Sequence, residues 1–388
     1  MAHRLTSPPM GGRCDPRFAG VRDAFLRNFA EHDEVGAAVC IYVAGRVVAD
    51  LWGGHRDQAR RTPWREDTLV NAYSVGKGVT AALALALVER RVLDLDAPVA
   101  NGWPGFAARG KEGITLRMLL SHRAGLPGVR EPLPDGAVLD WTRMCGAVAG
   151  QAPYWEPGTR HGYHVNTQGF LVGEVVRRAT GLGVGEALRR ELLDPLGAEF
   201  FVGLPASQHG RVAEMRDHGV MPRRREQWER VFPATGDAVH DQMVWHAYFN
   251  PPDLSGVGMV NSAAWRSAQV PSSNGHATAR AVATIYRALL DGRWLSSELR
   301  AEATRIHSDG EDVVLARPSR FGLGFQLGQP TRPLGPNSAS FGHYGYGGSL
   351  GFADPEAGLA FGYLMNRPGQ RWQTPRSQNL IDAAYAAL

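Results

Sequence analysis

The chain has 388 residues, of which 44% are hydrophobic and 21% charged, and its formal net charge is +4. This length exceeds that of a usual single domain, so we expect one large domain or two interleaved domains of an ordinary globular protein. The sharpest basic run, Arg223 to Arg225, is followed at once by Glu226. Such a short run favours a solvated surface over a nucleic-acid groove, and no nucleic-acid partner is expected.

No segment has the pattern of export or of membrane insertion. The N-terminus, MAHRLTSPPMGGRCDP, is polar and lacks the apolar region of a secretory signal, and no apolar run reaches the length of a membrane span. The three cysteines, Cys14, Cys40 and Cys145, lie far apart and form no CxxC pair. This favours reduced thiols over a zinc site or a disulfide framework. We therefore expect a cytoplasmic protein with no membrane partner.

The histidines do not have the spacing of metal ligands. His240 and His246 are six residues apart in HDQMVWH, whereas two ligands on one helix face need a spacing of three or four. No metal or other cofactor is expected.

In chain order, the first predicted element is a helix over residues 17–32, where apolar side chains recur at helical spacing. Two β-rich runs in residues 36–54, separated by the turn AGR, predict a hairpin. A strongly apolar helical pattern then opens at Ser74 and continues to about Arg91, where LDLDAPV ends it.

The middle of the chain is predicted to be helix and loop, and β-structure returns only near the C-terminus. The predicted helices are 115–127, ended by Gly125, then 169–181 and 275–292, with a last helix over 377–388. The late strands are 321–328, 347–354 and 359–366, with DPEAG as the turn between the last two.

Strands at both ends of the chain with helices between them predict an α/β protein of the α+β type. One antiparallel sheet, flanked by helices, would be built from both termini. The expected division is a discontinuous domain of residues 1–73 and 280–388, with a mainly helical domain of residues 74–279 inserted and the site at their interface.

The stretch NAYSVGKGVTAA carries the clearest chemical signal. Of the 42 basic residues only Lys77 and Lys111 are lysine. Ser74 and Lys77 are three apart, so a helix places them on one face. A serine nucleophile needs a base, which arginine cannot be, whereas a buried lysine loses its proton readily. At a helix start, the Ser74 N–H can also stabilise an oxyanion.

Three stretches in order, NAYSVGKGVTAALALALVERRVLDLDAPV, ITLRMLLSHRAGLP and WEPGTRHGYH, resemble the serine β-lactamase superfamily. The resemblance runs from about Val35 to Arg367 and is strongest to the class C-like branch, close to the family VIII carboxylesterases. It implies a β-lactamase/penicillin-binding-protein-like fold and an acyl-enzyme on the serine of S-x-x-K.

The resemblance implies further site residues. Tyr163 takes the place of the family's Tyr-x-Asn tyrosine, a phenolate or proton relay coupled to the lysine. His164 follows it as a substrate-binding candidate, but Val165 stands where the asparagine belongs, and Asn166 comes one place late. The missing asparagine weakens the β-lactamase interpretation.

The family's Lys-Thr-Gly motif is matched by His343-Tyr344-Gly345. These three residues are substrate-binding candidates, and the Tyr346 N–H would complete the oxyanion hole with that of Ser74. Histidine in place of lysine removes a permanent positive charge that would bind the carboxylate of a β-lactam. This favours ester substrates.

A second serine motif, G-x-S-x-G, surrounds Ser349. It is predicted to be a decoy, because it lies in β-rich sequence and no histidine follows it to serve as base. Residues from about 211 to 271 are expected to shape the pocket rim. Four aromatic residues there would either line an apolar acyl site or serve only packing: Trp228, Trp245, Tyr248 and Phe249.

The predicted function is therefore a serine hydrolase that cleaves small carboxylic esters. An acyltransferase that passes the acyl group to an amine or alcohol acceptor is the main alternative. A β-lactamase or D,D-peptidase is less favoured, and so is a catalytically inactive binding protein.

Overall fold

The computed structural model describes residues 8–216, 235–256, 258–369 and 372–388. Its main feature is a nine-stranded sheet in the order β1-β3-β2-β12-β11-β10-β9-β8-β7. The strands are β1 Met10–Cys14, β2 Gly36–Val43, β3 Arg46–Gly54, β7 Ser308–Asp312, β8 Arg317–Phe321, β9 Gln326–Leu327, β10 Phe341–Tyr344, β11 Leu350–Asp354 and β12 Leu359–Met365.

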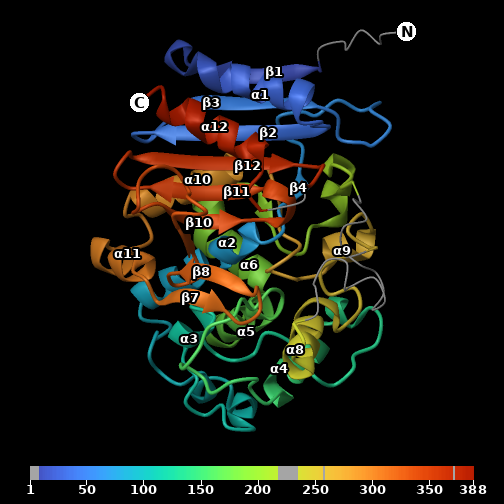
Figure 1. The fold of residues 1–388 in the computed structure, drawn as a ribbon, viewed down its shortest axis with the longest axis vertical. Coiled ribbons are helices and arrows are strands. Elements are labelled where there is room, and N and C mark those ends of the chain that lie inside the picture. Colours follow the sequence, from blue (N-terminus) through green and yellow to red (C-terminus); the bar gives the residue numbers. More distant parts are fainter. Residues whose placement is uncertain (1–7, 217–234, 257, 370–371) are drawn as a thin grey trace.

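Every neighbouring pair in this sheet is antiparallel. The N-terminal hairpin β2–β3 joins the C-terminal hairpin β11–β12 through the pairing of β2 with β12, for example Ile41 opposite Phe361. The prediction of one antiparallel sheet built from both ends of the chain is confirmed (Figure 1).

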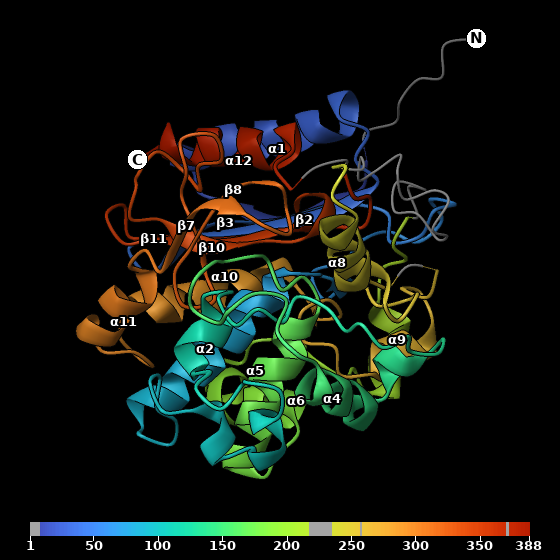
Figure 2. The same cartoon turned by 60° about the horizontal axis from the view of Figure 1, so that its bottom comes forward.

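Helices cover both faces of the sheet (Figure 2). On one face, α1 (Ala19–Glu31) packs against α12 (Pro375–Tyr385). On the other, α10 (Ala279–Leu290) lies along β12, β2 and β11, and α2 (Val75–Glu89) lies against β10. The other α-helices within the described residues are α3 Leu116–Leu120, α4 Trp141–Gly150, α5 Thr167–Thr180, α6 Val184–Leu188, α8 Ala238–Phe249, α9 Ala263–Ser267 and α11 Ser297–Thr304.

α2 is the central helix of the protein. All side chains from Val75 to Leu87 are buried, which explains why this stretch is apolar all round rather than on one stripe. A small sheet, β4 (Val70–Asn71) with β6 (His276–Ala277) and β5 (Phe200–Phe201), precedes the helix and fixes where it starts.

Several predicted boundaries were wrong. The helix predicted for 115–127 ends at Leu120, because His122 takes a left-handed φ of 60° before Gly125 is reached. The strand predicted for 321–328 is broken, since Gly324 has a φ of 80° and lies where a Cβ would be 2.2 Å from the Ala81 side chain of α2. The chain bends there to press against the central helix.

Two other predicted elements start later than expected. The helix predicted from residue 275 begins at Ala279, because residues 276–277 form β6 and the Thr278 side chain caps the helix by accepting from the Ala281 N–H. The strand predicted from residue 347 begins at Leu350, after a 3-10 turn, η8 (Tyr346–Gly348).

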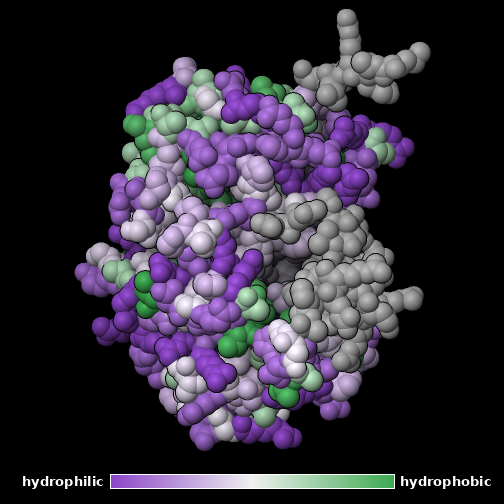
Figure 3. Space-filling view, in the orientation of Figure 1, coloured by the Kyte–Doolittle hydropathy of each residue, from purple (hydrophilic) through white to green (hydrophobic). Residues whose placement is uncertain are grey.

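The face of the molecule in Figure 3 is largely hydrophilic, with apolar side chains in small separate spots. The exposed large apolar side chains of the described residues are Leu26, Val92, Val239, Ile306 and Leu388. No helix within the described ranges is long and apolar enough to cross a bilayer.

Candidate active site

Ser74 stands at a sharp turn from strand to helix. β4 ends at Asn71, Tyr73 takes a left-handed φ of 49°, and Ser74 directly precedes α2. A non-glycine residue in this region of φ stores strain, which is common beside functional side chains. The turn leaves the Ser74 N–H in the first turn of the helix, where N–H groups lack an intrahelical acceptor.

Lys77 lies one turn further along α2, and its Nζ donates to Ser74 Oγ at 2.9 Å. The same amine donates to the Ser272 carbonyl at 3.2 Å. The lysine is only 1% exposed, and burial lowers its pKa well below the usual value. This shift increases the share of the uncharged amine, which is the form that can accept a proton from a serine hydroxyl.

Two glycines allow the elements around Lys77 to approach closely. A Cβ at Gly76 would lie 2.3 Å from the Pro271 carbonyl oxygen, and one at Gly78 would lie 2.3 Å from the Tyr286 hydroxyl. The first approach brings the segment with Ser272 onto the helix, so that its carbonyl meets the lysine.

Tyr163 completes the cluster and is 1% exposed. Lys77 Nζ lies 4.9 Å from the centre of its ring. Burial raises the pKa of the phenol, and interaction with the Ser74 hydroxyl offsets part of that increase. The phenol forms no hydrogen bond of ordinary geometry with the described residues. The phenol is therefore neutral at ordinary pH and lies beside the serine.

His343, on β10, faces the same cluster. Its ring stacks on Tyr163 with centroids 6.0 Å apart, and its Nδ1–H donates to the Tyr344 carbonyl at 2.7 Å. Burial is the main cause that lowers its pKa to about 3, and the proximity of Lys77 acts in the same direction. The imidazole is thus uncharged at neutral pH, and its Nε2 has no partner among the described residues.

The two residues after His343 differ in orientation. Tyr344 points to the opposite face of β10, as strand alternation requires, where its hydroxyl donates to the Pro333 carbonyl at 3.3 Å. A Cβ at Gly345 would lie 2.4 Å from the Ala72 carbonyl oxygen, so glycine brings this strand end against the segment before Ser74.

Tyr346 begins η8, beside the turn that carries Ser74. Its ring packs edge-on against Tyr73 with centroids 5.3 Å apart. This contact places Tyr346 beside the residue that precedes Ser74.

His164 has a structural environment rather than that of a substrate ligand. It is fully buried, its Nε2 accepts from the Leu126 N–H at 2.9 Å, and its Nδ1–H donates to the Gly162 carbonyl at 2.6 Å. Both ring nitrogens are thereby used to hold the loop before α5, and none is left for a substrate.

Where the family has an asparagine side chain, this protein has the apolar side chain of Val165. Val165 is 9% exposed and packs in a cluster with Tyr163 and Phe249. The Asn166 side chain is turned away into other contacts: it accepts from the Ser273 hydroxyl at 2.7 Å and donates to the Ala247 carbonyl at 3.2 Å. Neither residue presents an amide beside Ser74.

Ser349 does not have the surroundings of a nucleophile. It is fully buried between η8 and β11, its hydroxyl has no partner among the described residues, and no helix follows it. Gly351 is required because a Cβ there would lie 2.4 Å from the Tyr286 ring. The G-x-S-x-G glycines serve close packing.

Three of the four aromatic candidates for the rim lie within the described residues. Trp245, Tyr248 and Phe249 lie on α8 and belong to the apolar cluster that contains Tyr163. Trp228 and the basic run Arg223–Arg225 lie outside the described residues.

Sequence reasoning missed the aromatic partners of Tyr163. Phe321 stacks on its ring with centroids 5.7 Å apart, and Trp372 packs edge-on at 5.3 Å. Both come from segments more than 150 residues further along the chain, so no local pattern could have indicated them. Both rings also line a small pocket.

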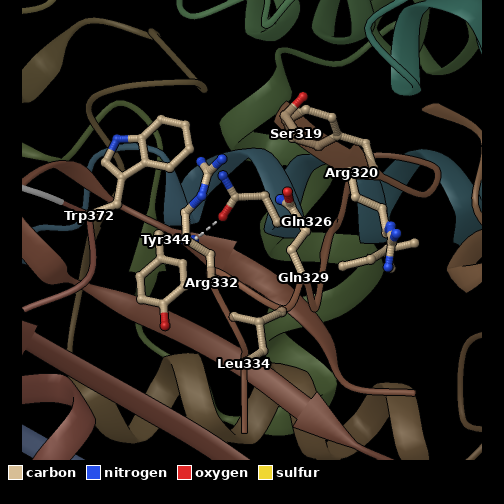
Figure 4. Close-up of a pocket in the computed structure, with 10 residues that line it drawn as sticks. Ser319, Arg320, Gln326, Gln329, Arg332, Leu334, Tyr344 and Trp372 are labelled. Carbon is tan, nitrogen blue, oxygen red and sulfur yellow. Dashed lines mark hydrogen bonds between the residues drawn. The ribbon is translucent and has the colours of Figure 1, made fainter. Parts of the chain in front are cut away.

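This pocket encloses about 310 Å³, including its open mouth, and is lined by ten residues. Figure 4 shows Trp372 and Arg332 on one side, Ser319 on another, and Gln326 accepting from the Tyr344 N–H. Among the side chains described by the structure, no group of His, Cys, Asp and Glu could hold a metal ion.

A serine hydroxyl held by a buried lysine amine, on a fold of this kind, is typical of serine acyl-transfer enzymes. A model of the beta-lactamase family matches residues 22–384. The chain belongs to the beta-lactamase family, as its motifs predicted.

Individual proteins support the same conclusion. The chain is 34% identical over 369 residues to the esterase/beta-lactamase LipL of Mycobacterium tuberculosis, covering 92% of this chain and 82% of that protein. It matches the crystal structure of a family VIII carboxylesterase with a TM-score of 0.88 and 39% identity, covering 98% of this chain and 100% of the other. A penicillin-binding-protein homologue from Caulobacter crescentus matches with a TM-score of 0.89 and 38% identity, again covering 98% and 100%.

Proposed function

We propose that this protein hydrolyses small carboxylic esters through an acyl-enzyme on Ser74. The observation that carries the proposal is the 2.9 Å contact between the Ser74 hydroxyl and the Lys77 amine, which is buried and whose pKa is lowered. The names of two similar proteins, an esterase/beta-lactamase and a family VIII carboxylesterase, support the ester as the substrate class.

In the proposed reaction, Lys77 Nζ accepts the Ser74 proton as Oγ attacks the ester carbonyl. The N–H groups of Ser74 and Tyr346 stabilise the oxyanion of the tetrahedral intermediate. The neutral Tyr163 phenol passes a proton to the departing alkoxide and is restored from the Lys77 ammonium. Water then attacks the acyl-enzyme with the same base, releasing the acid and free Ser74.

Two features support an ester over a β-lactam or peptide substrate. The uncharged His343 offers no fixed positive charge for a carboxylate. The Val165 side chain has no amide with which to hold a substrate amide. A β-lactamase or D,D-peptidase would bind its substrate through both kinds of group.

Acyl transfer to an amine or alcohol is the second candidate, because the base that activates water can equally activate either acceptor. The deciding experiment is turnover of a simple activated ester with amines or alcohols titrated in. A hydrolase gives mainly free acid at a rate little changed by the acceptor. Negligible turnover until one acceptor is added, with its amide or ester as product, would establish a transferase instead.

We further propose the cytoplasm as the working compartment. The three cysteines are free thiols, and Cys40 and Cys145 are buried, which suits a reducing environment. Thiol titration under denaturing, non-reducing conditions should find all three free, whereas a native disulfide would contradict this.

A further inference from the structure

The main chain of Tyr163 is held by a carboxylate 149 residues away in sequence. Asp312, the last residue of β7, is fully buried. Its Oδ1 and Oδ2 accept from the Tyr163 N–H at 3.0 Å and 3.1 Å. The tyrosine is thus anchored from outside its own loop.

The same carboxylate organises the turn between β7 and β8. Its Oδ1 accepts from the N–H groups of Val314 and Leu315, both at 2.9 Å, and its Oδ2 accepts from the Ser319 hydroxyl at 2.8 Å. A buried carboxylate with this many donors is fixed in one orientation.

Two further hydrogen bonds tie the hairpin to the segment before Tyr163. His161 Nε2 lies 3.0 Å from the Ser319 hydroxyl, and the Val313 N–H donates to the His161 carbonyl at 3.2 Å. Phe321, at the end of β8, stacks on the Tyr163 ring at 5.7 Å. One hairpin therefore holds both the main chain and the ring of the tyrosine.

We propose that Asp312 is a positioning residue for the acyl-transfer reaction: it fixes the Tyr163 main chain so that the phenol stays beside Lys77 and Ser74. The inference rests on the proposed function, in which Tyr163 relays a proton. A displacement of about 1 Å in such a group can cost about 10²-fold in rate.

Asp354 provides a matched control for the simpler view that Asp312 only caps a turn. It is the last residue of β11 and fully buried, and its Oδ1 accepts from the N–H groups of Glu356 and Ala357 at 2.9 Å and 3.1 Å. Its Oδ2 accepts from Asn337 Nδ2 at 2.8 Å and from the Tyr385 hydroxyl. Tyr385 belongs to α12 and Asn337 to the loop before β10, so the Asp354 carboxylate does not contact the Tyr163 segment.

The test compares Asp312→Ser, Asp312→Asn and Asp354→Ser. A serine hydroxyl can still accept from the turn N–H groups, but its shorter side chain does not reach the Tyr163 N–H. Asparagine retains an acceptor at full reach. With an activated ester as substrate, Asp312→Ser should lower kcat by about 10²-fold and change KM by no more than about twofold.

The other variants should separate positioning from stability. Asp312→Asn should recover most of the lost kcat, and Asp354→Ser should keep the full kcat while lowering the melting temperature. In a Tyr163→Phe background, Asp312→Ser should cause no further loss, because both changes remove the same contribution. Should Asp312→Ser not fold, Asp312→Glu, whose longer side chain displaces the Tyr163 N–H, should also lower kcat, whereas Asp354→Glu should not.

An unchanged kcat in a folded Asp312→Ser or Asp312→Glu protein would overturn the inference. So would a loss of kcat that is fully additive with Tyr163→Phe. Absence of ester turnover in the unaltered protein would instead overturn the proposed function, and the inference with it.

Discussion

The two lysines of this arginine-rich chain are both buried, at 1% exposure for Lys77 and 0% for Lys111. Sequence reasoning explained only the first, as a cation that must be able to lose its proton. Lys111 has a different use: its Nζ donates to the carbonyls of Ala108 and Gln151 and lies 5.5 Å from the centre of the Phe106 ring. A compact ammonium with three donors suits these contacts.

If Lys77 acts as a base, retaining its charge should not retain activity. Lys77→Arg should lower kcat for an activated ester by about 10²–10⁴-fold, nearly as much as Lys77→Ala, because arginine does not deprotonate. Lys111→Arg is the matched control: it should lower stability but leave the kcat of the folded protein unchanged. Wild-type activity in Lys77→Arg would mean that the lysine acts only as a charge.

The lowered pKa of Lys77 also predicts how stability depends on pH. Between that lowered pKa and the ordinary lysine value of about 10.4, the unfolded chain binds one more proton than the folded one. The free energy of unfolding should therefore rise with pH in this window, by up to about 1.4 kcal/mol per pH unit, relative to Lys77→Met. Urea unfolding of both proteins between about pH 7 and pH 9.5 checks this. Parallel curves would show that the buried amine stays protonated.

At the scale of elements, a buried ion pair fixes the C-terminal helix to the sheet. Arg376 of α12 contacts Glu34, just before β2, at 2.8 Å, with side chains 5% and 0% exposed. The Tyr363 hydroxyl of β12 donates to the same carboxylate. Burial raises the pKa of Glu34, and the Arg376 charge opposes that effect.

Removing one partner of this ion pair should lower the free energy of unfolding substantially. Glu34→Gln should lower the free energy of unfolding by about 3–5 kcal/mol, because it leaves the Arg376 charge buried without its counter-charge. Adding Arg376→Met should restore part of the loss, which urea unfolding of the single and double variants would measure. A double variant less stable than the sum of the two single changes would contradict this assignment.

The elements differ in how far the sequence alone predicts them. The hairpin β2–β3 and the helix α2 carry their own periodicity and apolar content, and both were predicted with nearly correct bounds. The hairpin β7–β8 was missed, because its strands SDGED and RPSRF are polar and only five residues long. They form strands through their pairing with each other and through Asp312, not through local preference.

The site residues also differ in how far the sequence alone predicts them. Ser74 and Lys77 were predicted from the residues themselves: their spacing places them on one helix face, lysine is rare in this chain, and a serine nucleophile needs a base. Tyr163 and His343 required the family resemblance, and His164 was assigned to substrate although the loop main chain uses both of its nitrogens. Asp312 has no sequence signal, because its contact with Tyr163 is purely tertiary.

For the whole molecule, the sheet built from both ends explains how distant segments meet at Ser74. The N-terminal β4 segment leads into the serine, and β10 and η8 bring His343 and Tyr346 from the far end of the chain. The division into residues 1–73 with 280–388, and 74–279, stays a proposal. α2 opens the second of these segments yet packs against β10 of the first.

The most direct test of the central claim is intact-protein and peptide mass spectrometry after exposure to an activated ester or a fluorophosphonate probe. The account predicts a single covalent adduct on the peptide that contains Ser74. Ser74→Ala should abolish it, and a folded Ser349→Ala protein should retain both adduct and turnover. An adduct found on Ser349, or turnover that persists in Ser74→Ala, would contradict the account.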